Sequence, residues 1–105
     1  MLFSLKEMYK GTTPTLLFTT EAEVLDLTRA TDVYVTLSDM NKKELMTKSD
    51  LYIEAKRVGV YLTQEETLSL PRRIQAQINW TYNSKRMCSQ IMILNVNDNL
   101  LNKVI

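Results

Sequence analysis

The segment from Arg73 to Trp80 constrains the fold more than any other part of the sequence, because apolar and polar side chains alternate along it without interruption. The even-numbered residues form an apolar set and the odd-numbered residues a polar one: Ile74, Ala76, Ile78 and Trp80 against Arg73, Gln75, Gln77 and Asn79. A period of two predicts a β-strand with one buried face and one face in water.

A long hairpin is predicted around this strand. Thr81–Lys85 has turn chemistry, and Asn83 suits a left-handed backbone conformation. Arg86–Val96 is then the returning strand, and its two sides are both apolar: Met87, Ile91 and Ile93 against Cys88, Met92, Leu94 and Val96. Either set can face the core. The other set needs a different cover, from the chain termini or from another subunit.

The rest of the chain supplies further short strands with turn signals between them. The expected strands are Thr15–Thr20, Val33–Leu37, Glu44–Lys48, Leu51–Ala55 and Val58–Leu62, with Leu2–Met8 as an edge strand or an arm. Two capping boxes, Thr20–Glu23 and Thr63–Glu66, each predict no more than a short helical turn. We therefore expect residues 1–105 to form one all-β domain, an immunoglobulin-like antiparallel β-sandwich of about seven short strands. Periodicity alone leaves a small barrel as the alternative.

Composition excludes several kinds of chemistry. The chain has no histidine and one cysteine, which removes the usual zinc sets, the histidine-dependent nucleophiles and any internal disulfide. A net charge of +1 gives no basic field for nucleic acid. No apolar run approaches the length of a membrane span, and a charge follows too soon after Met1 for a signal peptide. We expect no enzyme activity, cofactor, metal, nucleic acid or membrane partner.

The residues that suggest chemistry also have simpler interpretations. Glu21, Glu23, Glu65 and Glu66 occupy first-turn positions of helices, where negative charge is favourable. Asp26 is expected to cap a loop, and Cys88 to act as a small apolar packing residue. Trp80 and Tyr82 would form a sugar-stacking pair if exposed. Trp80 is in phase with the apolar side of its strand, however, and is expected in the core.

Four segments resemble the N-terminal domains of phage baseplate upper proteins and related short phage tail-associated structural proteins. They are Tyr9–Thr15, Leu25–Thr31, Val60–Leu68 and the hairpin, with Gln77 on its first strand and Arg86 and Ser89 on its second. The sequence departs from that pattern at Arg29, where glycine is expected, and in the last turn, which lacks an aspartate–glycine pair. The resemblance implies an immunoglobulin-like sandwich that is assembled in the bacterial cytoplasm into a virion or its tail. It also implies protein neighbours and no catalysis.

The leading hypothesis is therefore a non-enzymatic phage or prophage structural protein that acts through contacts with virion or tail proteins or with itself. Its interface is predicted at the apolar termini and one side of the returning strand: Leu2, Phe3, Leu5, Met92, Leu94, Leu101, Val104 and Ile105. The alternatives are a carbohydrate-binding module for host cell-wall glycans and, less favoured, a regulatory or toxin-inhibiting partner.

Overall fold

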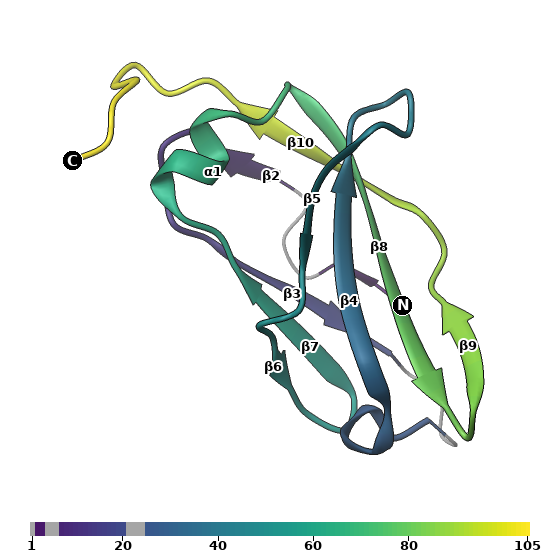
Figure 1. Cartoon of the computed structure of the whole chain (residues 1–105). Coiled ribbons are helices and arrows are strands. Elements are labelled where there is room, and N and C mark those ends of the chain that lie inside the picture. The colour runs from purple at the N-terminus through teal and green to yellow at the C-terminus, as the bar shows by residue number, and fades with distance from the viewer. Residues whose placement is uncertain (1, 4–6, 21–24) are drawn as a thin grey trace.

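The computed structural model describes residues 2–3, 7–20 and 25–105. Strands account for 51% of them and helices for 8%, which confirms the all-β prediction. The strands form two sheets that pack face to face as a sandwich (Figure 1). The sheets are separate, so the barrel alternative is wrong.

The first sheet has four antiparallel strands. In spatial order they are β1 (Leu2–Phe3), β3 (Thr15–Thr19), β7 (Arg57–Tyr61) and β6 (Tyr52–Ile53). The predicted strands Thr15–Thr20 and Val58–Leu62 are both present within one residue at each end. Leu51–Ala55 shortens to two paired residues, because Glu54 and Arg57 close a tight turn through reciprocal backbone hydrogen bonds.

The second sheet has six strands. In spatial order they are β2 (Glu7–Tyr9), β10 (Met92–Asn97), β8 (Arg73–Tyr82), β4 (Thr31–Ser38) and β5 (Glu44–Lys48), while β9 (Lys85–Cys88) pairs with the far end of β8. All pairs are antiparallel except β2 with β10. The alternating segment that dominates the sequence is thus β8, the centre of this sheet.

This strand order is that of an immunoglobulin-like sandwich. With β1 and β2 counted together as the first strand, β3 to β8 are the second to the seventh and β10 is the eighth. One sheet then has the order one, two, six, five, and the other has the order one, eight, seven, three, four. In immunoglobulin lettering the sheets are A-B-E-D and A′-G-F-C-C′. The helix α1 (Gln64–Leu68) is the short helical turn predicted at the Thr63 capping box, and it makes the crossover from β7 to β8.

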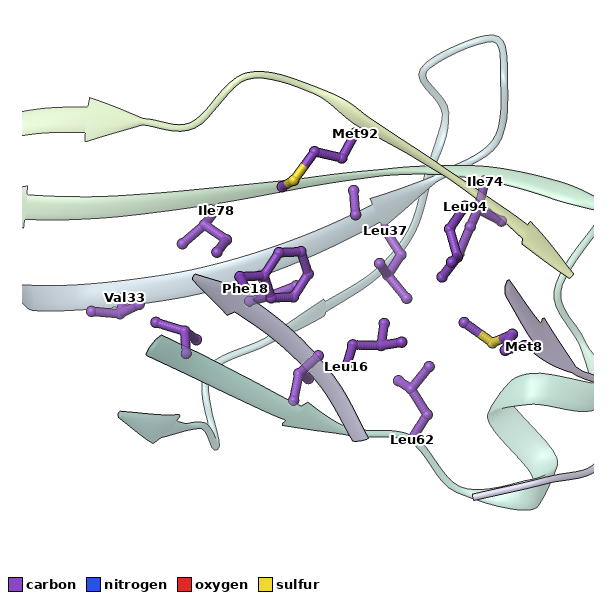
Figure 2. Packing of buried hydrophobic residues seen from close by; sticks show 14 of the residues in the cluster. Met8, Leu16, Phe18, Val33, Leu37, Leu62, Ile74, Ile78, Met92 and Leu94 are labelled. Carbon is purple, nitrogen blue, oxygen red and sulfur yellow. The ribbon is translucent and has the colours of Figure 1, made fainter. Parts of the chain in front are cut away.

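The core lies between the two sheets (Figure 2). Phe18 from β3 sits among side chains of the opposite sheet, and its neighbours in the cluster are all apolar. The predicted inward residues of the second sheet are buried, namely Val33, Val35, Leu37, Ile74, Ala76, Ile78 and Trp80. Alternation therefore identified the buried side of both β4 and β8.

The capping interactions predicted from the sequence are present where the structure describes the residues involved. The Thr63 hydroxyl accepts a hydrogen bond from the Glu66 N–H at 3.2 Å, and the Glu66 carboxylate accepts one from the Thr63 N–H at 2.9 Å. This capping box starts α1. Asp26 caps the 3-10 turn η1 (Leu27–Arg29) by accepting from the Thr28 N–H at 3.0 Å. The other predicted box, Thr20–Glu23, extends outside the described residues.

Candidate protein interface

The returning half of the hairpin contains a β-bulge. Asn79 of β8 pairs with Cys88, and Ala76 pairs with Met92, so two residues of β8 stand opposite the three residues 89–91. Ser89 closes the bulge: its N–H donates to the Ile78 carbonyl at 2.8 Å and its hydroxyl accepts from the Ile78 N–H at 3.0 Å.

The bulge decides which side of β10 is buried. One extra residue reverses the alternation, so Met92 and Leu94 point into the core (Figure 2). Val96 is buried as well. The predicted interface role of Met92 and Leu94 is therefore wrong, since their exposed fractions are 7% and 0%. Ile91 and Ile93 are the outward residues, and they remain 44% and 48% exposed.

Because of the bulge, Met87 does not share a side of the sheet with Ile91 and Ile93, and Cys88 does not share one with Met92 and Leu94. Met87 is paired with the buried Trp80, whereas Cys88 is paired with Asn79 on the outer side of the sheet. Cys88 is exposed, so its predicted role as a packing residue is wrong. The shift of one residue in the hairpin register is the physical reason.

The other predicted interface residues lie apart from one another. Leu2 and Phe3 form β1 in the first sheet, paired with Thr19 and Phe18, and Leu5 lies outside the described residues. Leu101, Val104 and Ile105 are exposed on the C-terminal segment, which runs past α1, away from β9 (Figure 1). The Ile105 N–H donates to the Gln64 side-chain carbonyl at 2.8 Å. The structure therefore does not bring the tail together with Ile91 and Ile93.

Nine outward side chains in the middle of the second sheet form a surface that we call the amide face. It consists of residues from four neighbouring strands: Tyr34 and Thr36 on β4, Leu45 and Thr47 on β5, Gln75, Gln77 and Asn79 on β8, and Ile91 and Ile93 at β10. None of these nine side chains is charged, but charged residues adjoin them: Arg73 is the next outward residue of β8, and the Arg86 guanidinium donates to the Asn79 side-chain carbonyl at 3.4 Å. Sequence periodicity predicted the outward glutamines but could not show which strands lie beside them.

A shallow recess of about 160 Å³ lies near the middle of the amide face, between Thr36, Gln77 and Ile91. The Gln77 amide is fixed there, because its Nε2 donates to the Ser89 carbonyl at 2.8 Å. At the rim, Lys42 has φ = 65° in a turn that Asp39 holds by accepting from the Asn41 and Lys43 N–H groups. Ser38, Gln75 and Ala76 complete the lining of the recess.

Carboxylates elsewhere have structural partners. The Thr28 hydroxyl donates to Asp26 and lowers the pKa of that carboxyl, with smaller help from the Thr28 N–H and nearby cations. The Tyr52 hydroxyl and then the Arg57 guanidinium lower the pKa of Glu54. Among the residues that the structure describes, no group of three or more acidic or cysteine side chains converges as a metal site would require.

Trp80 is only 5% exposed and lies in the core cluster, as predicted, and Tyr82 packs against that cluster. The pair therefore offers no exposed stacking platform for a sugar ring, which removes the feature on which the carbohydrate-binding alternative depended.

No helix in the described part of the chain is long and apolar enough to cross a membrane.

Comparison of the chain with protein-family models, with curated proteins and with solved structures finds no match, so the amide face has to be interpreted from its own chemistry.

Proposed function

We propose that this protein is a non-enzymatic protein-interaction module that binds a protein neighbour through the amide face. The observation that carries the proposal is the pair of half-exposed isoleucines, Ile91 and Ile93, beside the uncharged amides and hydroxyls of the neighbouring strands. The centres of protein interfaces are depleted in charged residues, and an apolar surface of this kind usually marks a binding site.

The energetics favour burial of this surface. Fully burying an isoleucine side chain is worth about 1.5–3 kcal/mol, so covering the exposed half of Ile91 and Ile93 contributes roughly 2 kcal/mol together. Amides and hydroxyls such as Gln75 and Thr36 cost far less to desolvate than ions, provided that they find partners. A polypeptide surface supplies both the apolar contact and the hydrogen bonds.

We further propose that the neighbour belongs to a phage virion or tail, which makes this protein an assembly or adaptor component. The support for this step is the resemblance of Tyr9–Thr15, Leu25–Thr31, Val60–Leu68 and the hairpin to baseplate-associated domains. An immunoglobulin-like sandwich suits the role, because it presents a rigid outer sheet surface supported by a packed core.

The experiment compares two adjacent positions that the bulge places on opposite sides of the sheet. Ile91→Lys adds a charge to the amide face and should leave the domain folded while abolishing co-purification with the products of the flanking genes. Met92→Lys places the same charge in the core and should unfold the domain, because an isolated buried ion is strongly unfavourable.

Thr15→Lys is the matched control, since Thr15 is exposed on β3 of the other sheet. It should preserve both folding and co-purification. Undiminished binding by a folded Ile91→Lys variant would contradict the proposed face. Flanking genes that encode no virion proteins would contradict the proposed assembly.

A further inference from the structure

We propose that the recess in the amide face receives an acidic side chain, aspartate or glutamate, of the protein neighbour. The inference rests on the proposed function, because it names the group that the neighbour inserts at the same face. The volume of the recess, its unused hydrogen-bonding groups and its charge each fit such a side chain.

The volume of the recess fits one side chain. It measures about 160 Å³, close to the ~150 Å³ of an engineered cavity that takes up a single benzene molecule. Pockets that hold cofactors or other small molecules usually measure about 300–1,000 Å³. The recess is therefore too small for a ligand of that kind and matches one side chain that projects from a protein surface.

The two glutamines that line the recess have unused hydrogen-bonding groups. Gln75 Oε1 accepts from the Ser38 hydroxyl at 3.4 Å, whereas its Nε2 makes no hydrogen bond within the described part of the chain. Gln77 has the reverse arrangement, because its Nε2 donates to the Ser89 carbonyl and leaves its Oε1 unused. The recess thus offers a free amide N–H₂ group and a free carbonyl to a ligand.

Lys42 determines the charge that the ligand should carry. Among the described residues that line the recess, Lys42 alone is charged. Its ammonium forms no ion pair with any described carboxylate, and this includes Glu44, which lies opposite Ser38 on the edge strand β5. A neighbour that covers the face takes water away from this ammonium. A carboxylate compensates for that loss best, because charge-assisted hydrogen bonds are stronger than neutral ones.

The backbone keeps Lys42 at the rim of the recess. Its φ of 65° lies in the left-handed region, which favours glycine or asparagine over lysine. The turn is nevertheless well bonded, since the Lys42 N–H donates to the Asp39 carbonyl at 3.1 Å and the Asp39 N–H donates to the Lys43 carbonyl at 2.9 Å. A residue held in an unfavourable backbone conformation is a feature of binding sites and active sites.

An acidic side chain satisfies all of these groups together. Its carboxylate accepts from the Lys42 ammonium and from Gln75 Nε2, while its methylene group contacts Ile91. Arg73, the next outward residue of β8 beside Gln75, is exposed and forms no ion pair with a described residue, so it adds to the positive field. A basic side chain would be repelled by Lys42, and an apolar one would leave the Gln75 amide unpaired.

The test uses two acetylated and amidated pentapeptides, Ala-Val-Glu-Val-Ala and the same sequence with glutamine in the centre. They are titrated to about 20 mM into the full chain, because one inserted side chain supplies little binding energy and the Kd should be millimolar. The side-chain amide signals of Gln75 and Gln77 are followed by NMR. The glutamate peptide should shift both signals and bind about fivefold more tightly than the glutamine peptide, as expected for one ion pair at a partly exposed site.

Two neighbouring lysines provide the variant and its control. Lys42→Gln removes the charge and keeps a side chain of similar length, so the two peptides should then bind equally while thermal unfolding stays unchanged. Lys43→Gln removes a charge from the next residue, which does not line the recess, and should keep the fivefold preference. The preference of the wild type should also fall at about 1 M salt, where charges are screened within roughly 3 Å.

Equal affinity of the wild type for the two peptides overturns the acidic ligand. A preference that survives Lys42→Gln, or one that Lys43→Gln abolishes, overturns the assignment to Lys42. Absence of any shift, or shifts confined to residues outside the amide face, overturns the recess as the receiving site.

The two proposals fail in distinguishable ways. If the peptides bind equally but Ile91→Lys loses co-purification with flanking gene products, the interaction face is correct and the acidic side chain is wrong. If the glutamate peptide binds as expected but Ile91→Lys keeps its partner, the recess is a carboxylate site and the neighbour binds elsewhere.

Discussion

Trp80 illustrates at the scale of one residue how burial and polarity compete. Its ring is part of the core cluster, near the end of β8. Its indole Nε1 is buried and has no hydrogen-bond partner among the described residues. Leaving such a donor unpaired costs about 1–3 kcal/mol, yet burying the large ring gains more. Trp80 therefore stabilises the fold through the apolar surface that its ring buries, in spite of its unpaired N–H group.

Two substitutions at Trp80 should separate these contributions. Trp80→Ala should lower the free energy of unfolding by about 3–5 kcal/mol, the range for removing a large buried ring. Trp80→Phe should cost clearly less, because it removes the unpaired donor and keeps most of the apolar contact. Urea denaturation measures both losses.

Trp80 is the only tryptophan in the chain, so intrinsic fluorescence reports on it alone. The wild-type emission should be blue-shifted and poorly quenched by iodide. Red-shifted, readily quenched emission would contradict its burial and would restore the sugar-stacking interpretation.

At the scale of elements, the returning strand shows how one extra residue redirects a whole surface. The sequence has apolar residues on both sides of this strand, so its pattern does not specify which side is buried. The bulge at residues 89–91 sets the register, and the Ser89 hydroxyl compensates for the irregular backbone by accepting the Ile78 N–H and donating to the Gln90 carbonyl. The outward orientation of Ile91 and Ile93 therefore depends on this local irregularity.

Ser89→Ala should therefore be destabilising although it removes a single oxygen. The buried Ile78 N–H would lose its side-chain acceptor, and we expect the free energy of unfolding to fall by about 1–3 kcal/mol. Gln90→Ala is the control, because Gln90 is exposed and should change stability by less than about 0.5 kcal/mol. Equal stability of the two variants in urea would show that the bulge does not depend on Ser89.

At the scale of the whole molecule, an ion pair connects the second sheet to the crossover between the sheets. Lys48 ends β5, and its ammonium donates to the Glu66 carboxylate of α1 at 2.7 Å. Partial burial raises the pKa of Glu66, but the bonds from Lys48 and from the Thr63 N–H outweigh it, so the pKa lies below its ordinary value of 4.5. One carboxylate thus serves both the helix cap and a long-range contact.

The sign of the pH dependence follows from that lowered pKa. Stability from this group is fully present above the unfolded-state value near 4.5 and is lost as the pH falls through the lower folded-state value. Glu66→Gln keeps a side chain that suits the capping box but no longer titrates. Between about pH 6 and pH 3 the wild type should lose up to about 1 kcal/mol more than the variant. Parallel stability curves would show that the pair contributes nothing.

Much of the fold could be predicted from the sequence, because the deciding interactions are local. Alternation fixes which side of Val33–Leu37 and of Arg73–Trp80 is buried, since successive side chains of a strand point to opposite sides. The Thr63 box and Asp26 act within a few residues of themselves. Turn chemistry separates the strands, and short strands with one helical crossover favour an immunoglobulin-like sandwich.

Tertiary structure alone decided the candidate site. The neighbours of Gln75 and Gln77 come from strands some 30 to 40 residues earlier in the chain, and pairing over such distances leaves no local signal. The side of the returning strand that faces outward depends on a bulge whose register is fixed by contact with β8. Met92 and Leu94 are therefore buried while Ile91 and Ile93 are exposed: with apolar residues on both sides of a strand, only the packed partner sheet determines which set is covered.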